Sequence, residues 1–362
     1  MDKLKNYIPM LVTKQGEFKA IHHLDSNALS RLTPLFDVHR LSIASGKRKT
    51  LDEHIDKIVN NFEKYCIDIM FLLDCSKIEL SSRMKDGQHP FGYLCRALSE
   101  KGMKFIPVFG LDRDREYILA IKEYLFAAPY SSVCLRLLPE DMDGIGNLKA
   151  EINDALSLLG LDSQRCDLIV DFKSIEASQI DSIIDSLSQL NLVFPLANWR
   201  SFILAASSFP EDMSGIKRDT HESIRRVEND LWKTAILAEP LIGRKPRFGD
   251  YCVNNPSKPE VDVATMRAVA KIRYTTKETW EVFRGHGLQS QKGDKFSQYF
   301  NLAQQLTEAD CYMGAGYSWG DERVAQCAAE RKKTGNLLTW VQVDTNHHLT
   351  LIGEYIASFG EF

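Results

Sequence analysis

The segment Tyr7-Ile-Pro-Met-Leu-Val-Thr-Lys14-Gln-Gly16-Glu17 decides the fold class. Its apolar run predicts a buried strand, and a lysine, a glycine and a glutamate mark the exit from that strand into an amphipathic helix. The same unit recurs along most of the chain, and each apolar run ends in a charged or hydroxyl residue. Strands that are apolar on both faces and alternate with helices predict a parallel sheet covered by helices.

Counting these units separates two architectures, the closed barrel and the open doubly wound sheet. The regular units, with no Gly-x-Gly-x-x-Gly after the first strand, favour a TIM-like (β/α)8 barrel. The eighth strand is ambiguous between 247–252 and 268–274, and a long helix is expected over 219–237. The other strands are predicted at residues 7–13, 33–38, 67–74, 104–110, 132–138, 166–172 and 201–207.

The strand–helix rhythm ends near residue 255, after which turn residues are frequent. We therefore predict a barrel core over 1–255 and a C-terminal hairpin and helical extension over 256–362, packed on the barrel. The stretch 271–284 is typical of two short strands around a polar turn. Helices are expected near 295–308, 321–332 and 347–358, and the adjacent His347 and His348 are expected at the start of the last one.

Composition excludes several classes of protein. The 362 residues carry a formal net charge of −4, so no global basic field attracts nucleic acid. The 8 cysteines include no Cys-x-x-Cys pair, which argues against a zinc finger and for a reducing compartment. The N-terminus enters a strand without a signal-peptide core, and no run reaches the length of a membrane span. We expect a cytoplasmic protein without a membrane partner.

Polar residues recur where the predicted strands end, and in a parallel barrel these ends meet at the catalytic face. Asp37, Asp74 and Asp171 are candidates for acid/base chemistry, and three converging carboxylates would suit Mg²⁺. For each aspartate alone, a helix cap or an ion pair is the simpler interpretation. Lys14 and Glu17 complete the catalytic candidates, with an ion pair between them as the alternative.

Arg136 is the most informative single residue, because leucines surround a guanidinium that is costly to bury unpaired. One hypothesis is an arginine that holds a carboxylate or phosphate. The other is a structural ion pair with Asp171 or Asp74. The serine doublet Ser207-Ser208 follows the seventh strand, where barrels often bind phosphate. The remaining candidates for ligand binding are Lys173, Asp250, Arg273 and His347.

Several short motifs are distributed nearly from end to end of the chain: Ile8-Pro-Met-Leu-Val-Thr-Lys14-Gln-Gly16-Glu17, Leu32-Thr-Pro34-Leu-Phe-Asp37, Ser207-Ser-Phe-Pro210, Phe248-Gly-Asp250-Tyr251, Ile272-Arg273-Tyr-Thr-Thr276 with Trp280, Ser318-Trp-Gly-Asp321, and Thr339-Trp340 leading to Thr345-Asn-His-His-Leu349. Together these motifs resemble the Beta protein family, which occurs in bacteria and in T-even-type bacteriophages, although this family usually has a glutamate at the position of Asp37. The resemblance carries no assigned activity or catalytic residue, and it implies a role in phage–host conflict.

Two functional hypotheses follow. In the first, the chain is a hydrolase or lyase that acts on a phosphorylated or nucleotide ligand at the strand ends, with or without magnesium. In the second, it is a non-catalytic sensor that recognises a phage or host protein through the extension. A nucleic-acid partner is the weakest hypothesis, because the net charge is acidic.

Overall fold

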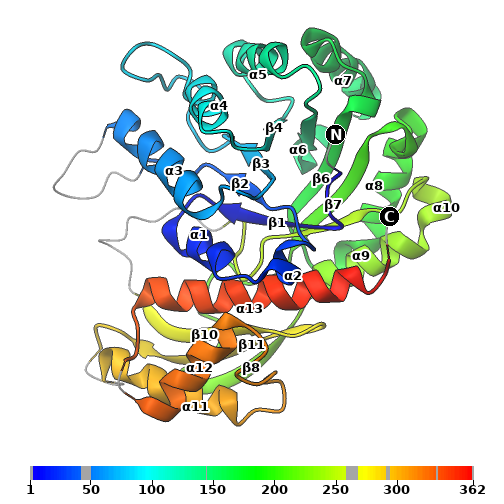
Figure 1. Cartoon of the computed structure of the whole chain (residues 1–362). Coiled ribbons are helices and arrows are strands. Elements are labelled where there is room, and N and C mark those ends of the chain that lie inside the picture. The colour runs from blue at the N-terminus through cyan, green and yellow to red at the C-terminus, as the bar shows by residue number, and fades with distance from the viewer. Residues whose placement is uncertain are drawn as a thin grey trace.

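Parallel strands close into a barrel at the centre of the molecule (Figure 1). The computed structural model describes residues 3–41, 50–143, 145–257, 268–290, 294–331 and 333–360. Around the barrel the strands follow the order β1-β2-β3-β4-β5-β6-β7-β9, so the ambiguous eighth strand is the one at 247–250. The strands are β1 (Tyr7–Val12), β2 (Leu35–Asp37), β3 (Phe71–Asp74), β4 (Phe105–Phe109), β5 (Val133–Leu137), β6 (Cys166–Ser174), β7 (Ser201–Ser207) and β9 (Arg247–Asp250).

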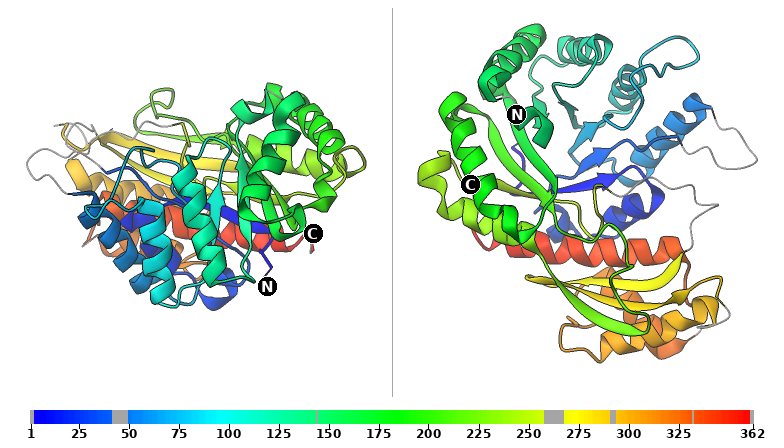
Figure 2. Two further views of the ribbon diagram at one scale, coloured as in Figure 1. Left: turned by 90° about the horizontal axis from the view of Figure 1, so that it is seen from above. Right: turned by 180° about the vertical axis from the view of Figure 1, so that it is seen from behind.

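Helices cover the outside of the barrel, and the predicted (β/α)8 fold is confirmed (Figures 1 and 2). Amphipathic spacing explains their inward faces: in the helix over 51–65, residues Ile55, Ile58 and Phe62 point to the strands and are buried. The helices on the barrel are α1 (Gln15–His22), α2 (Ser26–Leu29), α3 (Leu51–Tyr65), α4 (Pro90–Glu100), α5 (Arg115–Ala127), α6 (Pro139–Met142), α7 (Ile145–Leu159), α8 (Ile180–Val193), α9 (Val227–Leu237) and α10 (Glu239–Ile242).

Alternation along the strands separates two layers of core. Tyr7 and Leu11 of β1 face the helices, whereas Ile8 and Met10 face the barrel interior. The interior is therefore filled by side chains and is a packed core. Its members from the strands are Ile8, Met10, Leu35, Leu72, Ile106, Val108, Cys134, Ile169, Ile203 and Ala205.

A second, antiparallel sheet forms the base of the extension. Its order is β10-β11-β8, with β10 (Val269–Thr275) and β11 (Thr279–Gly287) forming the predicted hairpin. Helices α11 (Gln298–Thr307), α12 (Trp319–Glu330) and α13 (Leu337–Ala357) complete the extension. The expected hairpin and helical elaboration is thus present, with a third strand that the sequence pattern did not indicate.

That third strand corrects the helix predicted over 219–237. Thr220–Arg225 forms β8 and pairs with β11, and the helix α9 begins only at Val227. The strand carries Ile224 against Trp280, and its stability comes from this partner more than 50 residues later in the chain, which no local pattern reveals. Strand β8 lies before residue 255 in the chain, yet it pairs with β11, which lies after that residue. The domain boundary at residue 255 stays a prediction.

The last helix, α13, joins the two parts of the molecule (Figure 2). Trp340 and Val343 in its first half belong to the core of the extension, whereas Leu349 and Ile352 in its second half belong to the core around the barrel. The helix begins at Leu337, with Asn336 as its N-cap, so His347 and His348 lie in its middle and not at its start as expected. No helix among the described residues is long and apolar enough to cross a membrane.

Gly249 of β9 lies close against β7, and the space around it shows how tightly these two strands pack. A Cβ at this position would lie 2.9 Å from the Cβ of Ala205, and the backbone of the same residue is 3.3 Å away. We expect Gly249→Ala to lower the free energy of unfolding by about 1–3 kcal/mol, because strand β7 cannot move away. Gly146→Ala is the control, since nothing lies within 4 Å of a Cβ there, and it should be neutral or slightly stabilising. Equal effects in urea denaturation would contradict the tight fit of β9.

Candidate functional site

Arg136 of β5 gathers the acidic ends of three other strands inside the barrel mouth. Its Nη1 donates to Asp37 and to Asp74, each at 2.8 Å. Its Nε and Nη2 donate to Asp171 at 3.0 and 2.7 Å, and Nη2 also donates to the Tyr251 hydroxyl at 2.8 Å. A guanidinium has five N–H groups, and these contacts engage all of them. Both ion pairs weighed for Arg136 are therefore present in the structure.

Charge compensation explains why these groups tolerate burial. Asp74, with no exposed surface, also pairs with Arg113 at 3.1 Å. Burial alone would raise the pKa of Asp74, but the two guanidinium groups outweigh it and hold the pKa below its usual value. Lys77 also lies 3.8 Å from Asp37, so Arg136, Arg113 and Lys77 together place three positive charges against the three carboxylates. Magnesium at these residues stays a prediction.

Lys14 and Glu17 leave β1 at the same edge of the barrel. Lys14 is exposed at the N-cap of α1, whereas Glu17, in the first turn, is 5% exposed. Burial raises the pKa of the Glu17 carboxyl to about 7, although the positive charges of Lys14, Arg273 and Lys77 partly oppose the rise. Glu17 is therefore a carboxyl group that can gain or lose a proton near neutral pH.

Two further lysines stand at this rim. Lys77 lies beyond β3 with its Nζ 3.8 Å from Asp37, and Lys173 lies near the end of β6 with its Nζ 3.4 Å from Glu140. The backbone of Lys173 is left-handed, with a φ of 54°, and this turns its N–H onto Asp171 at 2.9 Å. The strained backbone thus fixes the carboxylate while the lysine side chain extends to the partly exposed surface.

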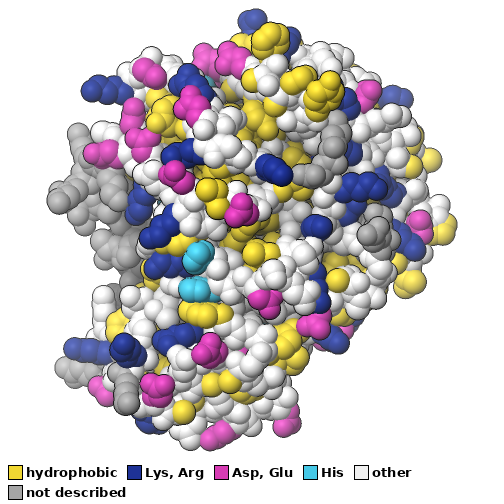
Figure 3. Space-filling model, viewed as in Figure 1, with side chains coloured by type: hydrophobic (Ala, Val, Ile, Leu, Met, Phe, Trp, Pro, Cys, Tyr) yellow, Lys and Arg dark blue, Asp and Glu magenta, His cyan; other side chains and the backbone are white. Residues whose placement is uncertain are grey.

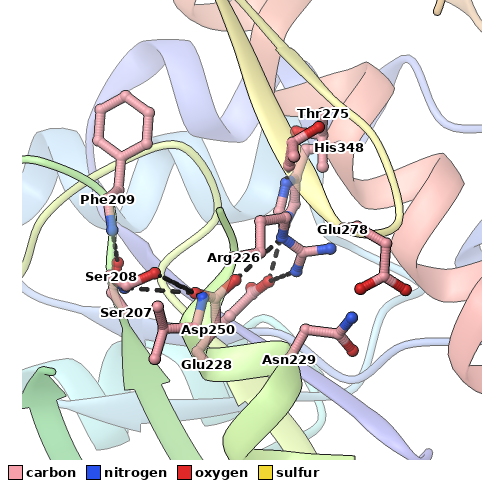
Figure 4. Close-up of polar contacts among 12 residues, drawn as sticks. Ser207, Ser208, Phe209, Arg226, Glu228, Asn229, Asp250, Thr275, Glu278 and His348 are labelled. Atoms are coloured by element: carbon pink, nitrogen blue, oxygen red, sulfur yellow. Dashed lines mark hydrogen bonds and ion pairs between the residues drawn. The ribbon is translucent and has the colours of Figure 1, made fainter. Parts of the chain in front are cut away.

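A second polar cluster lies where the barrel meets the extension (Figure 4). Asp250, at the end of β9, accepts hydrogen bonds from the Tyr7 hydroxyl at 2.9 Å and from Arg226 Nη2 at 3.3 Å. Its Oδ2 also lies 2.9 Å from Nε2 of His348 in α13. Arg226 in turn pairs with Glu228 at 2.9 Å. Burial would raise the pKa of Asp250, but His348 and Arg226 together lower it.

The serine doublet predicted to bind phosphate is engaged by this second cluster. Ser208 Oγ donates to Glu228 at 2.8 Å and accepts from the N–H of Val227 at 2.9 Å. Ser207 Oγ donates to the carbonyl of Asn254 at 3.1 Å. In the structure, both hydroxyls therefore tie the exit of β7 to the segments beside it.

Arg273 and His347 are buried contacts of the extension. Arg273 of β10 pairs with Asp344 at 2.7 Å and donates to the carbonyl of Val253, beyond β9, at 2.8 Å. His347 places Nδ1 2.8 Å from Asp321 and Nε2 2.8 Å from the carbonyl of Thr275. Both of its ring nitrogens thus face hydrogen-bond acceptors. These residues join the extension to itself and to the barrel.

Sequence reasoning missed four residues of these clusters. Arg226 is four residues before Asp230, a spacing that predicts a pair on a solvated helix face, yet Arg226 is 1% exposed and its neighbour Arg225 makes that pair. Glu228 lies in the same stretch, and it is buried too. Arg113 and Tyr251 stood beside strand ends that the sequence did identify, so their position was the available signal.

Comparison with known proteins adds the family. No curated protein sequence matches the chain. Among solved structures, the chain is similar in fold to one described as "Crystal Structure of Dihydropteroate synthetase with Product1", with 12% identity, a TM-score of 0.39, and coverage of 70% of this chain and 89% of that chain. The family model described as Beta protein matches residues 7–353, and the chain therefore belongs to the Beta protein family.

Proposed function

We propose that the rim of the barrel binds a small phosphorylated ligand and that Glu17 transfers a proton to or from it. The observation that carries this proposal is the buried Glu17 carboxyl, whose pKa burial raises to about 7. General acid–base catalysis is most efficient when the pKa of the group lies near the working pH. Such a group can assist both hydrolysis and elimination at a phosphate ester.

Lysines supply the anion contacts in this proposal. Lys14 is exposed beside Glu17, and Lys77 and Lys173 keep about a third of their side chains exposed at the same edge. A flexible ammonium group suits a phosphate that arrives from solvent. Arg136 takes a different role, because its N–H groups are already engaged: it positions Asp37 and Asp171 below the rim. Magnesium is not required for this arrangement.

We propose further that the activity serves phage–host conflict. The support is membership of the Beta protein family, together with the role in phage–host conflict that the resemblance described above implies. Extended binding of nucleic acid is not part of the proposal. The net charge is −4, and Figure 3 shows basic and acidic side chains interspersed on the face viewed there.

Glu17 gives the free energy of unfolding a pH dependence with a fixed sign. Its folded pKa of about 7 lies above the ordinary value of 4.5, so the folded state binds the proton more tightly. This contribution is complete below the unfolded pKa and is lost as the pH rises through the folded pKa. Between about pH 4.5 and 8, wild type should lose up to about 3 kcal/mol relative to Glu17→Gln in urea denaturation. A constant difference between the two proteins would contradict the raised pKa.

Activity is tested on a panel of phosphomonoesters and nucleotides. We expect Glu17→Gln to lower kcat by about 100-fold or more, because the amide cannot transfer the proton. Lys14→Ala should instead raise KM, since it removes an anion contact. Glu116→Gln is the matched control, because Glu116 also lies in the first turn of a barrel helix but pairs with Arg83 at the surface. Turnover unchanged in Glu17→Gln would refute the catalytic proposal.

The biological proposal is tested by plating phages on bacteria that express the chain. We expect wild type and Glu116→Gln to change the plating efficiency equally, and Glu17→Gln to have no effect on plating. If Glu17→Gln, expressed at the same level, acts like wild type, the effect does not depend on proton transfer. That result would favour the non-catalytic protein that recognises a phage or host partner.

A further inference from the structure

Three side chains at the junction of barrel and extension offer the donor types that zinc prefers. Asp250 and Cys252 lie two residues apart at the exit of β9, and His348 comes from the middle of α13. One ligand atom from each residue lies within 4.8 Å of the other two, and all three residues are buried. Carboxylate oxygen, thiolate sulfur and imidazole nitrogen are the ordinary ligands of zinc in proteins.

We propose that Asp250, Cys252 and His348 bind a structural zinc ion that fastens α13 to the closing strand of the barrel. This proposal does not depend on the proposed activity, because its tests measure bound metal and not turnover. Because the three side chains are at most 1% exposed, no substrate can reach the metal. A structural role, and not catalysis, is therefore assigned to it.

The surroundings of His348 suit a zinc ligand. Its Nε2 lies 2.9 Å from Asp250 Oδ2 and would be the zinc ligand. The single proton of the neutral ring would then lie on Nδ1, 2.8 Å from the hydroxyl of Thr275, which can accept it. Histidine ligands commonly donate their second N–H to such an oriented partner.

The other ligands are oriented as well. The N–H of Cys252 donates to Asp250 Oδ1 at 3.1 Å, and the left-handed backbone of Cys252, with a φ of 53°, allows this contact. The Tyr7 hydroxyl lies 2.9 Å from Asp250 Oδ1 and 3.9 Å from Cys252 Sγ. Tyr7 is therefore the side chain placed to complete the coordination, directly or through water.

The positive charge of Arg226, 3.3 Å from Asp250, would repel a metal cation. Glu228 offsets this charge, because its carboxylate pairs with Arg226 at 2.9 Å and the pair is neutral by itself. Zinc bound by one thiolate and one carboxylate is neutral too. The metal-free cluster, in contrast, holds two buried carboxylates and one guanidinium. When zinc binds and Cys252 releases its thiol proton to solvent, the cluster as a whole becomes neutral.

The test measures zinc in the full chain by mass spectrometry after expression with zinc and extensive dialysis. We expect about one zinc per chain, lost in Cys252→Ser and in His348→Gln. Cys134→Ser is the matched control, because Cys134 is an equally buried barrel cysteine without these partners. When cobalt replaces zinc, wild type and Cys134→Ser should show a thiolate-to-metal absorption band. Cys252→Ser should not show it.

Stability gives an independent readout. A strong chelator should lower the Tm of wild type and of Cys134→Ser but not that of Cys252→Ser. If a substituted protein does not fold, the zinc content and cobalt spectrum of wild type still decide. Wild type without zinc, or zinc held equally by Cys252→Ser and Cys134→Ser, would overturn the proposal and leave a hydrogen-bonded network in its place.

Discussion

The buried carboxylate of Asp250 is the constraint on which the rest of the structure depends. A charge without contact to water is stable only if other groups neutralise and hydrogen-bond it. Its partners come from β1, from the start of α9 and from α13. Asp250 at the end of β9 therefore links the barrel to α13, and the two parts of the chain stabilise each other.

At the barrel mouth, buried carboxylates are compensated in a different way, by the single central cation Arg136. There the cation is central and the three carboxylates surround it, so the cluster holds four strands in register without reaching outside the barrel. Glu17 remains outside both clusters. Its burial without a neutralising partner of this kind is what moves its pKa to about 7. The Arg136 cluster and Glu17 thus differ in how far nearby charges compensate a buried carboxylate.

The sequence predicted the barrel because buried parallel strands and amphipathic helices each leave a local pattern. It also offered an ion pair of Arg136 with Asp171 or Asp74 as one of two hypotheses, and both contacts are present; the contact with Asp37 was not predicted. It could not predict β8, whose partner lies far along the chain. Nor could it place Arg226, which has the local spacing of a surface residue and long-range partners inside the molecule. The polar run before His347 suggested a helix start, but tertiary burial makes it a helix centre.

The order of strands in the chain also affects how the protein is made. Strand β8 leaves the ribosome between two barrel strands, β7 and β9, but its partner β11 is synthesised more than 50 residues later. At ordinary translation speeds this interval lasts on the order of seconds. During it, β8 presents unpaired backbone groups, and the barrel lacks the helix that covers β1. The nascent chain is thus expected to fold late and as one unit, and to depend on chaperones until α13 has emerged.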